Sequence, residues 1–134
     1  MMITVRELRN MFLQCPEDWN IEFRKWEHGS LEDFKEKYPR YPIPNLVSIQ
    51  IKEVVTRSNS DHEWINHIFI VEDDFDDNFI MNRDEMIEFF CNGLADYELI
   101  SFELNTKEGN IPLTIEVGDK GYSDKIMMIN LEEN

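Results

Sequence analysis

Residues 46–71 read LVSIQIKEVVTRSNSDHEWINHIFIV and carry two β-rich segments around one polar turn. Val, Ile, Thr, Phe and Trp are frequent in Leu46–Thr56 and Trp64–Val71, and these residue types favour strands. The intervening SNSDHE has the small polar residues typical of a turn. The stretch therefore predicts two strands joined by a polar turn.

Three helices are predicted around these strands. Residues 4–7 (TVRE) fit a capping box, in which a threonine oxygen and a glutamate satisfy free N–H groups, and Pro16 would stop that helix. A second capping pattern opens a short helix over residues 30–38. Asn82 can cap a third helix, whose apolar residues are expected to face a core: Met86, Ile87, Phe89, Phe90 and Leu94.

Four further strands complete the predicted fold. Alternating apolar residues mark residues 19–26, and β-favouring runs occupy residues 98–104, 111–117 and 125–131. We therefore expect an α+β fold, with about three helices packed on a mostly antiparallel sheet of five or six strands. The length of 134 residues suits a single domain, residues 1–134.

The net charge of −15 is extreme for a chain of this size. Nucleic acid and anionic membranes are improbable direct partners, because both are polyanions. The N-terminus lacks the apolar core of a signal peptide, and no apolar run reaches the ~18 residues that span a bilayer. Cys15 and Cys91 stand in apolar patterns without a CxxC partner, so we expect buried thiols in a reducing cytosol.

The acidic residues are concentrated in the middle of the chain. Residues 1–57 have nine acids and nine bases, whereas residues 58–103 have thirteen acids and one base. Within that segment, VEDDFDDNFI (residues 71–80) places five carboxylates in six positions beside apolar residues. Such segregation exceeds what solubility alone requires.

Two conventional interpretations of this acidic segment are possible. Oxygen-bearing side chains recur with the rhythm of a calcium-binding EF-hand loop, but Phe79 occupies the position that needs glycine. The five predicted ligands would be Asp74, Asp76, Asn78, Asn82 and Glu85. The other interpretation is a solvated acidic turn that leads into a helix, where acids in the first turn suit the helix dipole.

The functional interpretation is a preformed acidic face that binds a basic protein. Carboxylates spaced along a rigid surface can imitate DNA phosphates and attract a basic groove. An aromatic side chain at the tip of the turn would act as an apolar anchor. The candidate partner-binding residues are Asp73, Asp74, Phe75, Asp76, Asp77, Glu85 and Glu88.

Enzyme signatures are absent from the sequence. It contains no GxSxG, HExxH, glycine-rich phosphate loop or Cys/His metal spacing, so neither catalysis nor a cofactor is expected.

Both ends of the chain resemble a group of small phage and mobile-element proteins. The opening ITVRELRNMFLQCPEDWNIEF is similar to their TVxEL start, their Pro-Glu-Asp and their first strand, and KIMMINLEE resembles their last strand. These stretches cover about a quarter of the chain, and no activity transfers with them. The size and acidity also resemble those of phage anti-defence inhibitors, including anti-CRISPR proteins, and of bacterial immunity proteins against nuclease toxins.

The leading hypothesis is a stoichiometric, DNA-mimicking inhibitor of a nucleic-acid enzyme in the cytoplasm of a bacterial host, with a CRISPR nuclease as the expected target. The first alternative is an immunity protein that neutralises a nuclease toxin. The second is a structural or calcium-responsive accessory protein.

Overall fold

The computed structural model describes residues 1–26, 36, 39–40, 46–61, 63–74 and 76–133, and within them the chain is mostly β. The helices bounded within the described residues are α1 (Val5–Phe12) and α3 (Arg83–Cys91). The strands are β1 (Met2–Thr4), β2 (Asn20–Trp26), β3 (Leu46–Ser58), β4 (Ile65–Asp74), β5 (Ile80–Asn82), β6 (Leu99–Thr106), β7 (Gly109–Gly121) and β8 (Ile126–Glu133).

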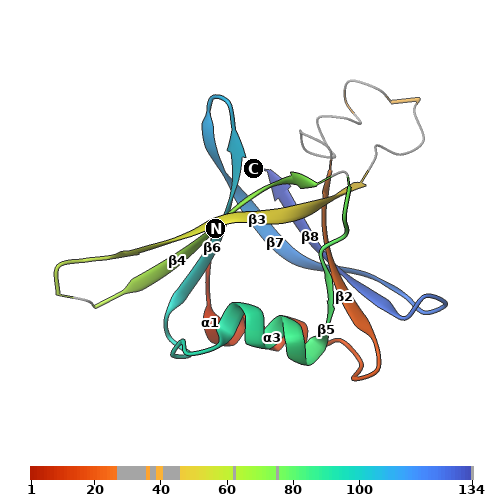
Figure 1. Ribbon diagram of the computed structural model, residues 1–134, viewed down its shortest axis with the longest axis horizontal. Helices are drawn as coiled ribbons and strands as arrows, with labels where there is room; N and C mark the ends of the chain where they lie inside the picture. Colours follow the sequence, from red (N-terminus) through yellow and green to blue (C-terminus); the bar gives the residue numbers. More distant parts are fainter. Residues whose placement is uncertain (27–35, 37–38, 41–45, 62, 75, 134) are drawn as a thin grey trace.

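Six of the strands close into a barrel (Figure 1). The order around it is β6, β4, β3, β2, β8 and β7, and β7 then pairs with β6 again. The pairs β4–β6 and β2–β8 are parallel, and the other four are antiparallel. Closure leaves fewer open edges than a flat sheet of the same strands would have.

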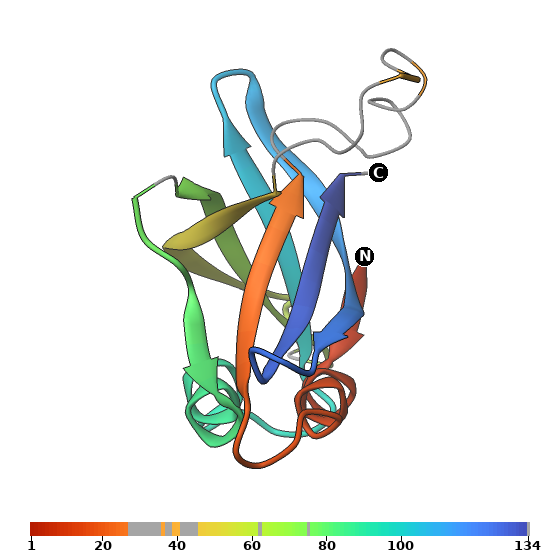
Figure 2. The same cartoon turned by 90° about the vertical axis from the view of Figure 1, so that its right-hand side faces the viewer.

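The two short strands, β1 and β5, complete the wall of the barrel in its lower half. β7 pairs with β6 over Phe102–Thr106, and β1 takes the same edge of β6 over Leu99–Ser101. Similarly, β3 pairs with the end of β2, while β5 pairs with its start, Asn20–Glu22. Helices α1 and α3 follow these short strands and lie together across the base of the barrel (Figure 2).

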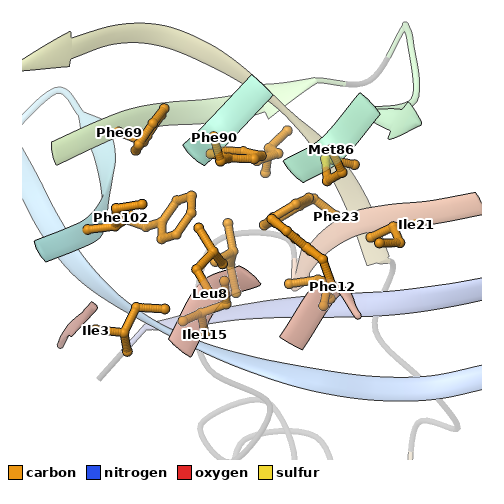
Figure 3. Close-up of a cluster of buried hydrophobic side chains, with 14 of the residues drawn as sticks. Ile3, Leu8, Phe12, Ile21, Phe23, Phe69, Met86, Phe90, Phe102 and Ile115 are labelled. Atoms are coloured by element: carbon orange, nitrogen blue, oxygen red, sulfur yellow. The ribbon is translucent and has the colours of Figure 1, made fainter. Parts of the chain in front are cut away.

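An aromatic cluster fills the barrel above the helices (Figure 3). Phe12 from α1 and Phe90 from α3 reach into it and meet Phe23, Phe69 and Phe102 from the strands. Ring centroids lie 4.8–6.1 Å apart, within the range of favourable aromatic pairs. The helices are therefore held to the barrel by their apolar side chains.

Both helices begin as the sequence predicts. Thr4 and Glu7 form the capping box, and the side chain of Asn82 accepts a hydrogen bond from the Glu85 N–H. The first helix ends at Phe12, before Pro16 is reached, and the chain turns between these two residues. In the part of the chain that the structure describes, no helix is long and apolar enough to cross a membrane.

The predicted α+β fold of three helices packed on a sheet is wrong. The described residues form a closed barrel with two helices at its base, and eight strands replace the five or six expected. The predicted helix at residues 30–38 lies almost entirely outside the described residues. Local periodicity misses the closure because the β6–β7 and β2–β8 pairings depend on which strands meet, and not on the pattern within each strand.

Candidate protein-binding face

The acidic segment runs from the upper end of β4, through a loop, to β5 and α3 at the base (Figure 1). Its carboxylates therefore do not form one compact cluster. Some of them serve the fold and others are exposed to solvent.

Asp73 is used inside the barrel. Lys25 shares the inner face of β2 with Ile21 and Phe23, and its Nζ lies 2.9 Å from Asp73 Oδ1. The Lys25 side chain is 1% exposed, and its amine also donates to the Trp26 carbonyl at 2.6 Å. The contact with Asp73 is an ion pair without good hydrogen-bond geometry, since Asp73 Oδ1 has no hydrogen-bond partner. Asp73 therefore neutralises a buried cation and is not free for a partner.

Asp74 organises the loop that follows β4. Its Oδ1 accepts hydrogen bonds from the backbone N–H groups of Asp76 and Asp77, at 2.9 and 3.1 Å. This arrangement is an Asx-type turn, in which a side chain replaces a backbone acceptor. The turn fixes the direction in which the next two carboxylates leave the barrel.

Asp76 and Asp77 are exposed, as are Glu85 and Glu88 on α3. None of these four carboxylates forms an ion pair or a side-chain hydrogen bond with another residue that the structure describes. Phe75, the predicted aromatic anchor, lies outside the described residues.

Helix α3 also carries an exposed phenylalanine, next to Glu88 in the chain. Phe89 is 46% exposed, contrary to the prediction that it faces the core. Its ring meets that of Phe79 at 5.5 Å in an edge-on contact, which joins α3 to the loop before β5. Ile80, the residue after Phe79, is 38% exposed. Asp76, Asp77, Ile80, Glu85, Glu88 and Phe89 are called the acidic–apolar face from here on.

The one base of the acidic segment does little to neutralise this face. Arg83 lies 3.5 Å from Asp84, the neighbouring acid on α3, and its guanidinium also donates to the Cys15 carbonyl at 3.4 Å. Because the Arg83 guanidinium contacts Asp84 and the Cys15 carbonyl, it does not neutralise the carboxylates of the acidic–apolar face.

Some of the side chains predicted to bind calcium have other roles in the structure. Asp74 and Asn82, two of the five predicted ligands, accept backbone hydrogen bonds in a turn and a helix cap. Among the described residues, no group of three or more His, Cys, Asp or Glu side chains is placed to hold a metal ion.

The sequence contained a signal for the exposed position of Phe89. Residues four apart share a helix face, so Phe89 lies with Glu85, whereas Phe90 lies with Met86. Met86 is fully buried and Phe90 is 1% exposed. The polar partner four residues earlier was therefore a better guide to the environment of Phe89 than its own hydrophobicity.

Comparison with known proteins returns no match: no family model, no curated protein and no solved structure is similar to this chain.

Proposed function

We propose that this chain is a non-enzymatic protein that binds the basic nucleic-acid groove of an enzyme, with a nuclease as the leading candidate, and inhibits it stoichiometrically. The observation that carries the proposal is the acidic–apolar face, which combines four exposed carboxylates without described ion-pair partners with the half-exposed Phe89. Charge of this kind accelerates association with a basic surface, and an aromatic side chain supplies an anchor once contact is made.

The proposed contact is narrower than the full acidic segment. Asp73 and Asp74 are already engaged with Lys25 and with the loop backbone, so they position the face and do not contact the partner. Asp76, Asp77, Glu85 and Glu88 would take the places of DNA phosphates, and Phe89 would fill the anchoring role first expected of Phe75.

The test is a competition between this protein and DNA for one purified nuclease. A CRISPR nuclease and a toxin nuclease are the two candidate partners, and inhibition of the latter would indicate an immunity protein. We expect pre-bound DNA to block the inhibitor, and we expect association to slow when salt rises from about 50 to about 200 mM, because exposed charges are screened.

Two variants of equal charge localise the effect. Asp76→Asn/Asp77→Asn/Glu85→Gln/Glu88→Gln should slow association at least ~10-fold. Glu17→Gln/Glu116→Gln/Asp119→Asn/Asp124→Asn removes four exposed acids elsewhere and should change the rate much less. Equal effects of the two variants would show that net charge matters and that the face does not. A ternary complex with DNA still fully engaged would refute phosphate mimicry.

A further inference from the structure

A second surface, which shares no residue with the acidic–apolar face, is a groove on the outer side of the barrel. It has a volume of about 580 Å³, within the range of small-molecule sites. The outer faces of β4 and β6 form its floor, and no described helix lines it. Its rim includes the half-exposed Met1, Met2 and Trp64. Ile68 on the floor is only 4% exposed, which shows that the surface is recessed and not flat.

Strand register places three polar side chains together in this groove. Arg57 of β3 lies directly opposite Asn66 of β4, and Ile68 of β4 lies beside Ser101 of β6. Asn66 and Ser101 are 8% and 7% exposed, unusually low values for polar side chains on an outer sheet face. The Ser101 hydroxyl donates to Asn66 Oδ1 at 3.3 Å. The Asn66 oxygen is thereby engaged, and its amide nitrogen remains a donor.

Arg57 adds a cation that has no counter-ion among the described residues. Among the residues that the structure describes, it forms no ion pair and no side-chain hydrogen bond, although the chain has 28 acids and 13 bases. Glu103, the one acid among the described residues that line the groove, belongs to β6 and lies opposite Pro112. By strand geometry its backbone is about 13 Å along and about 10 Å across the sheet from that of Arg57.

The other lining side chains are apolar. Trp64, which precedes β4 in the chain, and Ile68 of β4 both line the groove, and Leu99 of β6 lies beside Asn66. A ligand whose anionic head meets Arg57 and Asn66 would therefore rest its body against an indole ring and aliphatic side chains. This combination of an apolar wall with a few convergent donors is typical of small-molecule sites.

We propose that this groove binds a small organic acid with a flat apolar body, whose carboxylate is held by Arg57 and by the side-chain amide of Asn66. A guanidinium matches a carboxylate with two parallel hydrogen bonds, and the amide adds a third donor from the floor. Trp64 stacks on the body of the ligand, and Ser101 holds the Asn66 amide in the orientation that donates. The proposal is independent of the protein-binding role of the acidic–apolar face.

The test uses 2-naphthoate as the acid and 2-naphthamide as its neutral counterpart of the same shape. Calorimetric titration of the full chain should show tighter binding of the acid by about 10- to 100-fold, the usual contribution of a charge-assisted hydrogen bond. Nuclear magnetic resonance should place the probe, through shifts of the Trp64 indole N–H and the Asn66 side-chain amide.

Matched variants separate the site from general electrostatics. Arg57→Gln should abolish the preference for the acid while weak binding of the amide persists, and Arg57→Lys should keep part of the preference. Arg6→Gln removes an exposed arginine of α1 that does not line the groove, so it should leave the preference intact. Equal preference in the wild type and Arg57→Gln, an equal loss in Arg6→Gln, or shifts confined to residues outside the groove would overturn the proposal. Thermal unfolding checks that each variant is folded.

Discussion

The interior of the barrel has a different composition at its two ends. At the base, two short strands and two helices enclose a cluster of aromatic rings that contains Phe12, Phe23 and Phe90. At the opposite end, the interior holds the ion pair of Lys25 and Asp73. The interior of the barrel is therefore apolar at the base and contains a buried ion pair at the opposite end.

This difference indicates which end provides stability. Burial of apolar surface is the dominant favourable term in folding, whereas the attraction in a buried ion pair is largely offset by the cost of removing two charges from water. We therefore expect the base to stabilise the fold and the charged end to contribute little net free energy. That expectation can be tested by substitutions at each end.

The largest effect is expected at the centre of the base. Phe90 is 1% exposed and its ring meets six other aromatic rings, those of Phe12, Phe23, Phe69, Phe79, Phe89 and Phe102. Phe90→Ala should lower the free energy of unfolding by about 3–5 kcal/mol, because it removes the buried ring and leaves a cavity. Chemical denaturation measures this change.

The neighbouring residue provides the matched control for Phe90. Phe89→Ala removes the same side chain from a 46% exposed position, and it should cost no more than about 1 kcal/mol. If the two variants were equally destabilised, the assignment of Phe90 to the core and Phe89 to the surface would be wrong.

The second effect is expected at the charged end. Asp73→Asn leaves the Lys25 ammonium buried without its counter-ion and should cost about 2–3 kcal/mol. The value lies below that of a fully buried pair because the Asp73 side chain is 19% exposed. Replacing both residues, as Lys25→Met/Asp73→Leu, should restore stability to within about 1 kcal/mol of the wild type. A double variant as unstable as Asp73→Asn would show that the pair itself stabilises the barrel.

The two ends also show which features of the structure can be predicted from the sequence. Both observed helix caps were predictable from local patterns, as were β3 and β4 and the burial of both cysteines. The barrel was not, because its closure depends on pairings between strands distant in sequence. The role of Asp73 was missed for the same reason, since its partner Lys25 comes from another strand. The alternation of Ile21, Phe23 and Lys25 was nevertheless a signal that Lys25 points inward.

A third, smaller effect concerns acid stability at the base. Glu98 lies before β6, where its carboxylate accepts a hydrogen bond from the Ala95 N–H and lies 3.1 Å from His67 Nε2. Partial burial alone raises the pKa of Glu98, but the hydrogen bonds from Ala95 and His67 outweigh it, so its pKa is below the usual value. A carboxylate with a lowered pKa stabilises the fold above the unfolded-state pKa of about 4.3, and this contribution disappears as the pH falls through the lower, folded-state pKa.

Glu98→Gln should therefore destabilise the protein by about 1 kcal/mol near pH 7 and by progressively less below about pH 4. Denaturation of the wild type and the variant at several pH values measures the difference. The exposed Glu108→Gln, in the β6–β7 turn, is the control and should show no such trend. A constant difference across the pH range would mean that the charge of Glu98 does not contribute.

The smallest effect on stability is expected where the effect on binding should be greatest. Asp76, Asp77, Glu85 and Glu88 are exposed and have no ion-pair partner among the described residues, so neutralising all four removes mutual repulsion and, at Glu85, a small favourable interaction with the α3 dipole. The free energy of unfolding should stay within about 0.5 kcal/mol of the wild type or rise slightly at low salt. The change to Glu85→Gln keeps the backbone N–H that Asn82 caps, so the start of α3 is preserved. If instead this variant lost more than about 2 kcal/mol, these carboxylates would be part of the scaffold, and any loss of partner binding would reflect unfolding and not a missing contact. Stability that is unchanged, together with slower association, would separate the binding surface from the barrel that carries it.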